Sequence, residues 1–160
     1  EAIKQFLEIV QGNASTMDRK PRVFIGSSME GLPVARKLQG SLCEDFFIEI
    51  WNQGTEFGLG THTLEALEDV IGIYDFGVFV FTPDDKLYTR GETKSVARDN
   101  VIFELGLFTG KLGRTRAFIV KPRGTAITIP SDLAGVTTAT YDAENPNLIS
   151  ALRTGMREDS

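Results

Sequence analysis

Short apolar runs that alternate with segments of helical period constrain the fold of this chain more than any other feature. The strongest run is Phe76–Phe81, which has the composition of a strand buried on both faces. The expected strands are 23–25, 48–51, 76–81, 116–121 and 139–142, and the expected helices are 30–43, 63–73, 99–111 and 147–156. Strands and helices that alternate in this way form a parallel sheet with helices on both sides.

Right-handed crossovers leave few ways to connect such a sheet. Among them we expect the flavodoxin-like three-layer α/β sandwich, with about five parallel strands in the order 2-1-3-4-5. The polar segment 82–97 is expected to be a long loop, and Asp99 or Asn100 is expected to cap the helix after it. The domain is expected to span 21–160, and residues 1–20, a helical face and a linker, are expected to be the tail of an upstream domain.

The composition argues against several classes of protein. The 160 residues suit one domain, and a formal net charge of −5 argues against binding to a nucleic-acid backbone. No apolar run reaches the roughly 18 residues of a membrane span, and no signal peptide is visible. We therefore expect neither a nucleic acid nor a membrane as a partner.

The only cysteine, Cys43, and the only histidine, His62, lie far apart in the sequence, so they cannot supply a zinc site and no metal is expected. Cys43 falls in a helical pattern and is expected to be a buried structural thiol. A lone cysteine cannot form an internal disulfide, which indicates a reducing, cytoplasmic setting. His62 is expected in a loop or at a helix cap.

The expected fold places a ligand site at the carboxyl ends of the strands, where the strand order reverses between strands 1 and 3. Gly26, Ser27 and Ser28 follow the first strand directly. Their backbone N–H groups and hydroxyls suit a phosphate at a helix N-terminus. A tight turn with a serine cap would have the same sequence, so the residues alone leave both readings open.

Three further side chains fall at the same edge. Trp51 ends the second strand, where it can stack on a base or pack the sheet edge. Asp84, followed by a second aspartate, comes after the third strand, where it can accept ribose hydroxyls or form a solvated turn. Arg98, which ends the polar segment, can meet a phosphate or stay exposed.

Glu104 stands in a helix that has almost no polar face, with Phe103 and Leu105 on either side. A carboxylate is costly to bury unless it is paired or functional. Burial raises a carboxyl pKa, as it does in many catalytic sites. A structural carboxylate bonded to a backbone N–H or to an arginine is the alternative.

Three segments carry a family resemblance: 22–28 (RVFIGSS), 78–85 (VFVFTPDD) and 98–108 (RDNVIFELGLF). In this order and spacing they resemble the TIR-like nucleotide-binding family of bacterial anti-phage effectors, of the CBASS and Pycsar type. The resemblance covers about Arg22 to Pro122.

The resemblance implies an NAD⁺ glycohydrolase, in which NAD⁺ is the substrate rather than a cofactor. Glu104 falls on the position of the catalytic glutamate of TIR enzymes. Ser27 and Ser28 would line the site, and Gly26, Trp51, Asp84, Arg98 and Asn100 are taken with them as substrate-binding residues. The loop from Trp51 to His62 would correspond to the BB loop, which helps complete the site from a neighbouring subunit.

The resemblance also implies self-association through the TIR domain, triggered by an upstream cyclic-nucleotide sensor. Two other functions remain open from the sequence. One is a non-catalytic TIR scaffold, which has no need for a carboxylate at Glu104. The other is a different nucleotide or nucleoside glycosidase, because nucleoside deoxyribosyltransferases also combine a flavodoxin-like sheet with a glutamate.

Overall fold

The computed structural model describes residues 20–52 and 63–142. The expected helix and linker at 1–20, the BB loop with His62, and the expected last helix therefore lie wholly or mostly outside the described residues. The elements are β1 (Arg22–Ser27), α2 (Leu32–Leu42), β2 (Phe47–Asn52), α3 (Thr63–Ile71), β3 (Phe76–Val80), β4 (Asp85–Thr89), β5 (Glu92–Val96), α4 (Asp99–Leu112), η1 (Arg114–Arg116), β6 (Ala117–Pro122), η2 (Ser131–Leu133) and β7 (Thr137–Tyr141).

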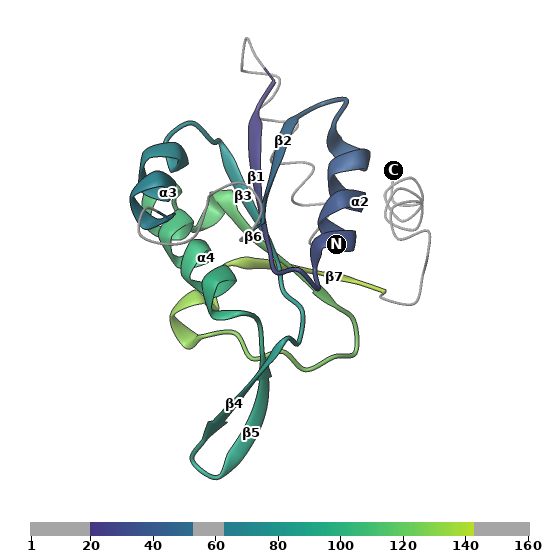
Figure 1. Cartoon of the computed structure of the whole chain (residues 1–160), viewed down its shortest axis with the longest axis vertical. Coiled ribbons are helices and arrows are strands. Elements are labelled where there is room, and N and C mark those ends of the chain that lie inside the picture. Colours follow the sequence, from purple (N-terminus) through teal and green to yellow (C-terminus); the bar gives the residue numbers. More distant parts are fainter. Residues whose placement is uncertain (1–19, 53–62, 143–160) are drawn as a thin grey trace.

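Five of the strands form one sheet in the order β2-β1-β3-β6-β7 (Figure 1). All four of its strand pairs are parallel. Because β6 and β7 are the fourth and fifth strands of this sheet, the expected order 2-1-3-4-5 and the flavodoxin-like class are confirmed. All five residues of β3 are buried, as expected for a central strand.

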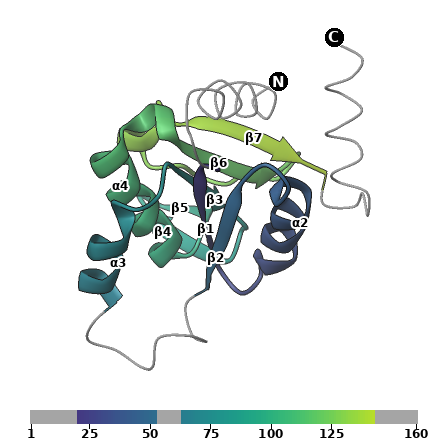
Figure 2. The same cartoon turned by 90° about the horizontal axis from the view of Figure 1, so that it is seen from above.

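Helices cover both faces of the sheet, with α2 on one side and α3 and α4 on the other (Figure 2). Successive residues of β1 point to opposite faces. Val23 and Ile25 join the apolar cluster under α2, whereas Phe24 joins the cluster under α3 and α4. The sheet is thus the middle layer between two cores, and only its strand ends are left for a polar site.

The segment expected to be a long loop instead holds the antiparallel hairpin β4–β5, which projects from the domain (Figure 1). Its strands are mostly exposed and polar, so they carry no apolar alternation that the sequence could reveal. Arg90 and Gly91 form its two-residue turn with φ values of 50° and 76°. Positive φ at both positions is what a tight hairpin turn requires.

Two local expectations were wrong. The N-cap of α4 is Arg98, with no side-chain cap bond, because Asp99 already lies in the helix and its Oδ1 accepts the N–H of Asn100 at 2.8 Å. Cys43 is exposed rather than buried. It follows α2 as its C-cap, and its thiol donates a hydrogen bond of 3.5 Å to the carbonyl oxygen of Gly40.

Candidate functional site

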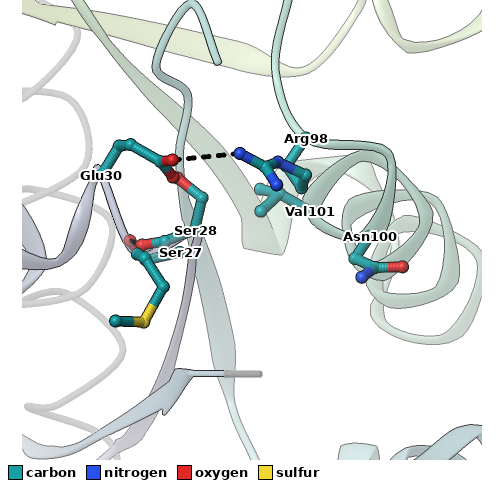
Figure 3. A pocket seen from close by; sticks show the side chains of 7 residues that line it. Ser27, Ser28, Glu30, Arg98, Asn100 and Val101 are labelled. Atoms are coloured by element: carbon teal, nitrogen blue, oxygen red, sulfur yellow. Dashed lines mark hydrogen bonds and ion pairs between the residues drawn. The ribbon is translucent and has the colours of Figure 1, made fainter. Parts of the chain in front are cut away.

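A pocket of about 160 Å³ opens between the β1–α2 turn and the first turn of α4 (Figure 3). It is lined by Ser27, Ser28, Met29, Glu30, Arg98, Asn100 and Val101. Four of the expected substrate-binding residues therefore meet at one place. That place is the carboxyl end of β1, where the strand order reverses, as the fold rule predicted.

Ser28 begins a chain of hydrogen bonds that leads away from the pocket. Thr82 donates its proton to Oδ1 of Asp84 at 2.5 Å, so in the 3.1 Å contact between Ser28 and Thr82 the serine is the donor. Ser28 Oγ also accepts the N–H of Gly31 at 3.3 Å. These bonds fix the rotamer of Ser28. Thr82 was not among the expected site residues, because nothing in the sequence around it shows that its hydroxyl meets that of Ser28.

Asp84 stands at the far end of this chain and does not line the pocket. Its negative charge, together with the larger effect of burial, raises the pKa of Tyr141 on β7. Asp84 is thus near enough to β7 for its charge to act on Tyr141. The expectation that it binds ribose stays a prediction, and it needs a ligand that reaches past Ser28.

Glu104 is 1% exposed and lies in the second turn of α4. Its Oε2 is 2.7 Å from the position that a Cβ on Gly26 would occupy. Gly26 is paired in register with Trp51 on one side and with Phe79 on the other. The carboxylate therefore fills the space between Trp51 and Phe79 that a side chain at Gly26 would otherwise occupy.

The Glu104 carboxylate is close to the pocket but does not line it. Val101, one helical turn before Glu104, forms the wall there. Trp51 is half-buried, and its ring centroid is 5.6 Å from that of Phe24. In this structure Trp51 therefore packs the sheet edge on the face that carries Glu104, and its stacking on a base stays a prediction.

Arg98 is held by two carboxylates. Its Nη2 is 3.1 Å from Oε1 of Glu30, across the pocket (Figure 3), and its Nε is 3.3 Å from Oδ2 of Asp85. Glu30 is a pocket residue that the sequence analysis did not select. Its position two residues after the Gly-Ser-Ser turn was the available signal.

The described residues hold neither a metal-binding cluster nor a membrane-spanning helix. In 20–52 and 63–142, no three His, Cys, Asp or Glu side chains are grouped as a metal ion would require. Over the same ranges no helix combines the length and apolar composition needed to cross a bilayer.

The strand order, the pocket at the switch point and the glutamate in the second turn of α4 together define a flavodoxin-like α/β domain of the TIR type. A family model described as "CAP12/Pycsar effector protein, TIR domain" matches residues 22–143. The chain belongs to this family of TIR effectors of anti-phage defence, which confirms the resemblance stated from the sequence.

Relatives of known name agree with this membership. The chain is 48% identical over 120 residues to the Pycsar effector protein PaPycTIR of Pseudomonas aeruginosa, covering 74% of the chain and 39% of that protein. It is 45% identical over 129 residues to BcPycTIR of Burkholderia cepacia, covering 80% and 42%. It is 37% identical over 123 residues to CD-NTase-associated protein 12 of Lachnospiraceae bacterium (strain RUG226), covering 77% and 38%. The chain thus spans only about two fifths of the length of these relatives.

Proposed function

We propose that this domain cleaves the bond between nicotinamide and ribose in NAD⁺, with Glu104 as the catalytic carboxylate. The observation that carries the proposal is the position of Glu104. Its side chain is 1% exposed, and its Oε2 occupies the space over Gly26 at the carboxyl end of β1. A scaffold gains nothing from a carboxylate buried there, since burial of a charged group is costly.

The chemistry requires one carboxylate and no general acid. The C–N bond breaks with both electrons going to the nicotinamide nitrogen, which is cationic in NAD⁺ and leaves neutral. Water then adds to the ribose carbon and releases a proton, giving ADP-ribose. The cationic, oxocarbenium-like sugar between these steps is stabilised by a nearby anion, and the attraction is stronger where apolar side chains exclude water.

The size of the pocket supports a role for self-association. At about 160 Å³ it is smaller than the roughly 300–1,000 Å³ of most ligand sites, and Glu104 does not line it. We infer that contact with a second copy of the domain completes the site and brings the substrate to Glu104. We further propose that an upstream cyclic-nucleotide sensor in the whole protein drives that contact, and the greater length of the Pycsar relatives, of which the match covers 39% and 42%, leaves room for such a domain.

The test is NAD⁺ consumption by the 160-residue chain, clustered on a multivalent scaffold, for wild type and Glu104→Gln. We expect nicotinamide release by the wild type and a loss of about 100-fold or more in the variant, the size of effect found when one electrostatic catalytic group is removed. Glu44→Gln is the matched control, because Glu44 is exposed in the turn before β2, at the opposite edge of the sheet.

Three outcomes would contradict the proposal. Equal turnover by wild type and Glu104→Gln would remove this residue from the mechanism. Absence of turnover in clustered wild type would favour a scaffold. Release of bases from deoxynucleosides in place of NAD⁺ would indicate a nucleoside glycosidase.

A further inference from the structure

Arg98 is the one cation among the residues that line the pocket, and two carboxylates from different elements compete for it. Glu30 contacts Arg98 from the β1–α2 turn, and Asp85, which is the first residue of β4, contacts it from the hairpin. The side chains are 40% exposed for Arg98, 54% for Glu30 and 42% for Asp85. Each ion pair is therefore in contact with solvent and individually weak.

The two carboxylates differ in where they stand. Glu30 lines the pocket and faces Arg98 from the opposite wall (Figure 3). Asp85 does not line the pocket and contacts Arg98 through Nε, on the side of the hairpin. Thus one carboxylate lies where a ligand would bind, and the other holds the arginine from behind.

We propose that Glu30 is an internal anion that occupies Arg98 until a diphosphate takes its place, and that Asp85 is the positioning residue that keeps Arg98 in the pocket. The proposal rests on the proposed function for the identity of the ligand, a diphosphate-linked dinucleotide. A guanidinium binds phosphate with paired hydrogen bonds and gains more from a doubly charged ligand than from one carboxylate.

The exchange makes Glu30 a determinant of substrate class. A ligand with a diphosphate can displace the Glu30 carboxylate, because it supplies Arg98 with a stronger partner. A neutral nucleoside offers Arg98 nothing in return, so it leaves the Glu30–Arg98 pair intact. The pocket would therefore select dinucleotides over nucleosides before any bond is broken.

The experiment measures the affinity for ADP-ribose of the 160-residue chain, clustered on the same multivalent scaffold as in the NAD⁺ assay, by calorimetry at low ionic strength. Glu30→Ala and Asp85→Ala form a matched pair, since each removes one carboxylate from the same arginine. We expect Glu30→Ala to bind ADP-ribose about two- to fivefold more tightly, the worth of one solvent-exposed ion pair. We expect Asp85→Ala to bind it more weakly by a similar factor, and adenosine affinity to be the same in all three proteins.

A double variant separates the exchange from simple repulsion. In an Arg98→Met background, Glu30→Ala should no longer tighten ADP-ribose binding if the two residues act as a pair. Tightening that persists there, equal tightening by Asp85→Ala, or no change with Glu30→Ala would each overturn the proposal. Thermal unfolding checks that each variant is folded.

The outcome is distinguishable from that of the proposed function, because ADP-ribose binding does not require catalysis. If NAD⁺ is cleaved while Glu30→Ala leaves both KM and ADP-ribose affinity unchanged, the exchange is wrong and the hydrolase stands. If the affinities change as expected without cleavage, the exchange stands and the hydrolase is wrong. If ADP-ribose binds to none of the proteins, the exchange is overturned.

Discussion

Two glutamates, Glu49 toward the amino ends of the strands and Glu104 toward their carboxyl ends, differ in exposure and in environment: the Glu49 side chain is 53% exposed, whereas Glu104 is buried. At the amino edge, Glu49 accepts a hydrogen bond from the Tyr74 hydroxyl and pairs with Arg22 at 2.8 Å. At the carboxyl edge, Glu104 is 1% exposed, and its Oε2 lies beside the position that a Cβ on Gly26 would occupy. Glu49 bonds to two side chains near the amino ends of the strands, whereas the Glu104 carboxylate is removed from solvent at the edge where this fold places ligand sites. The comparison is between a carboxylate that stabilises the framework and the one for which we propose a catalytic role.

The titration of the amino-edge group supports its structural role. The hydrogen bond from Tyr74 lowers the pKa of Glu49 below its ordinary value, Arg22 adds to that effect, and burial opposes it. Burial first, and the bond to Glu49 second, raise the pKa of Tyr74. Both shifts favour the same state, a charged carboxylate that accepts a hydrogen bond from a neutral phenol.

The largest expected effect comes from filling the space at Gly26. In Gly26→Ala the new Cβ would lie 2.7 Å from Oε2 of Glu104 and 2.8 Å from Cδ1 of Phe79. We expect the free energy of unfolding to fall by about 1–3 kcal/mol, the usual cost of overpacking, and NAD⁺ cleavage to fall as Glu104 is displaced. Urea unfolding and the clustered NAD⁺ assay measure the two effects.

Gly40→Ala is the control for the Gly26 substitution. Gly40 lies in α2 with open space around its Cα, so alanine should stabilise the helix by about 0.5–1 kcal/mol. Equal and small changes in the free energy of unfolding for Gly26→Ala and Gly40→Ala would show that the position of Glu104 does not depend on the space left at Gly26.

A second prediction compares the two glutamates by stability. Glu104→Gln should raise the free energy of unfolding by about 1 kcal/mol, because it replaces a buried charge with a neutral group of the same shape. Glu49→Gln should lower it by at most about 1 kcal/mol, because the bonds that it weakens are partly exposed to solvent. Changes of opposite sign in the free energy of unfolding, measured with urea at pH 7, would support the comparison. A lower free energy of unfolding for Glu104→Gln would contradict it.

The smallest expected effect is the pH dependence of the Glu49 contribution. A carboxyl whose pKa is lowered by folding stabilises the protein above its unfolded pKa, and that stabilisation is lost as pH falls through the folded pKa. The difference in stability between wild type and Glu49→Gln should therefore be complete at pH 7 and shrink below the ordinary value of 4.5. Unfolding curves at pH 7, 5 and 3.5 measure it, and a difference that grows in acid would refute the assignment.

The sequence predicted the sheet well, because strands that are buried on both faces, such as Phe76–Phe81, consist almost wholly of apolar residues and can be recognised by that composition. It missed the β4–β5 hairpin, because the strands of the hairpin are exposed and polar and have no apolar pattern. It selected Gly26 as part of a turn that suits a phosphate, and the structure shows that the absence of a side chain at this glycine leaves room for the Glu104 carboxylate. That contact joins β1 to α4, and no local pattern reports a contact between distant segments. Thr82 escaped notice for the same reason, whereas Glu30 had a local signal in its position two residues after the Gly-Ser-Ser turn.

The hydrogen bonds of Ser28 determine whether its hydroxyl can donate or accept a hydrogen bond with a ligand in the pocket. Its single proton goes to Thr82, and one of its lone pairs receives the N–H of Gly31. The Ser28 Oγ therefore keeps one free lone pair, which can accept a hydrogen bond, and has no proton left to donate. A ligand hydroxyl or amide N–H can satisfy that position, whereas a carbonyl oxygen placed there would face another oxygen and be repelled. The wall formed by Ser28 therefore distinguishes ligands by the polarity of their hydrogen bonds as well as by their shape.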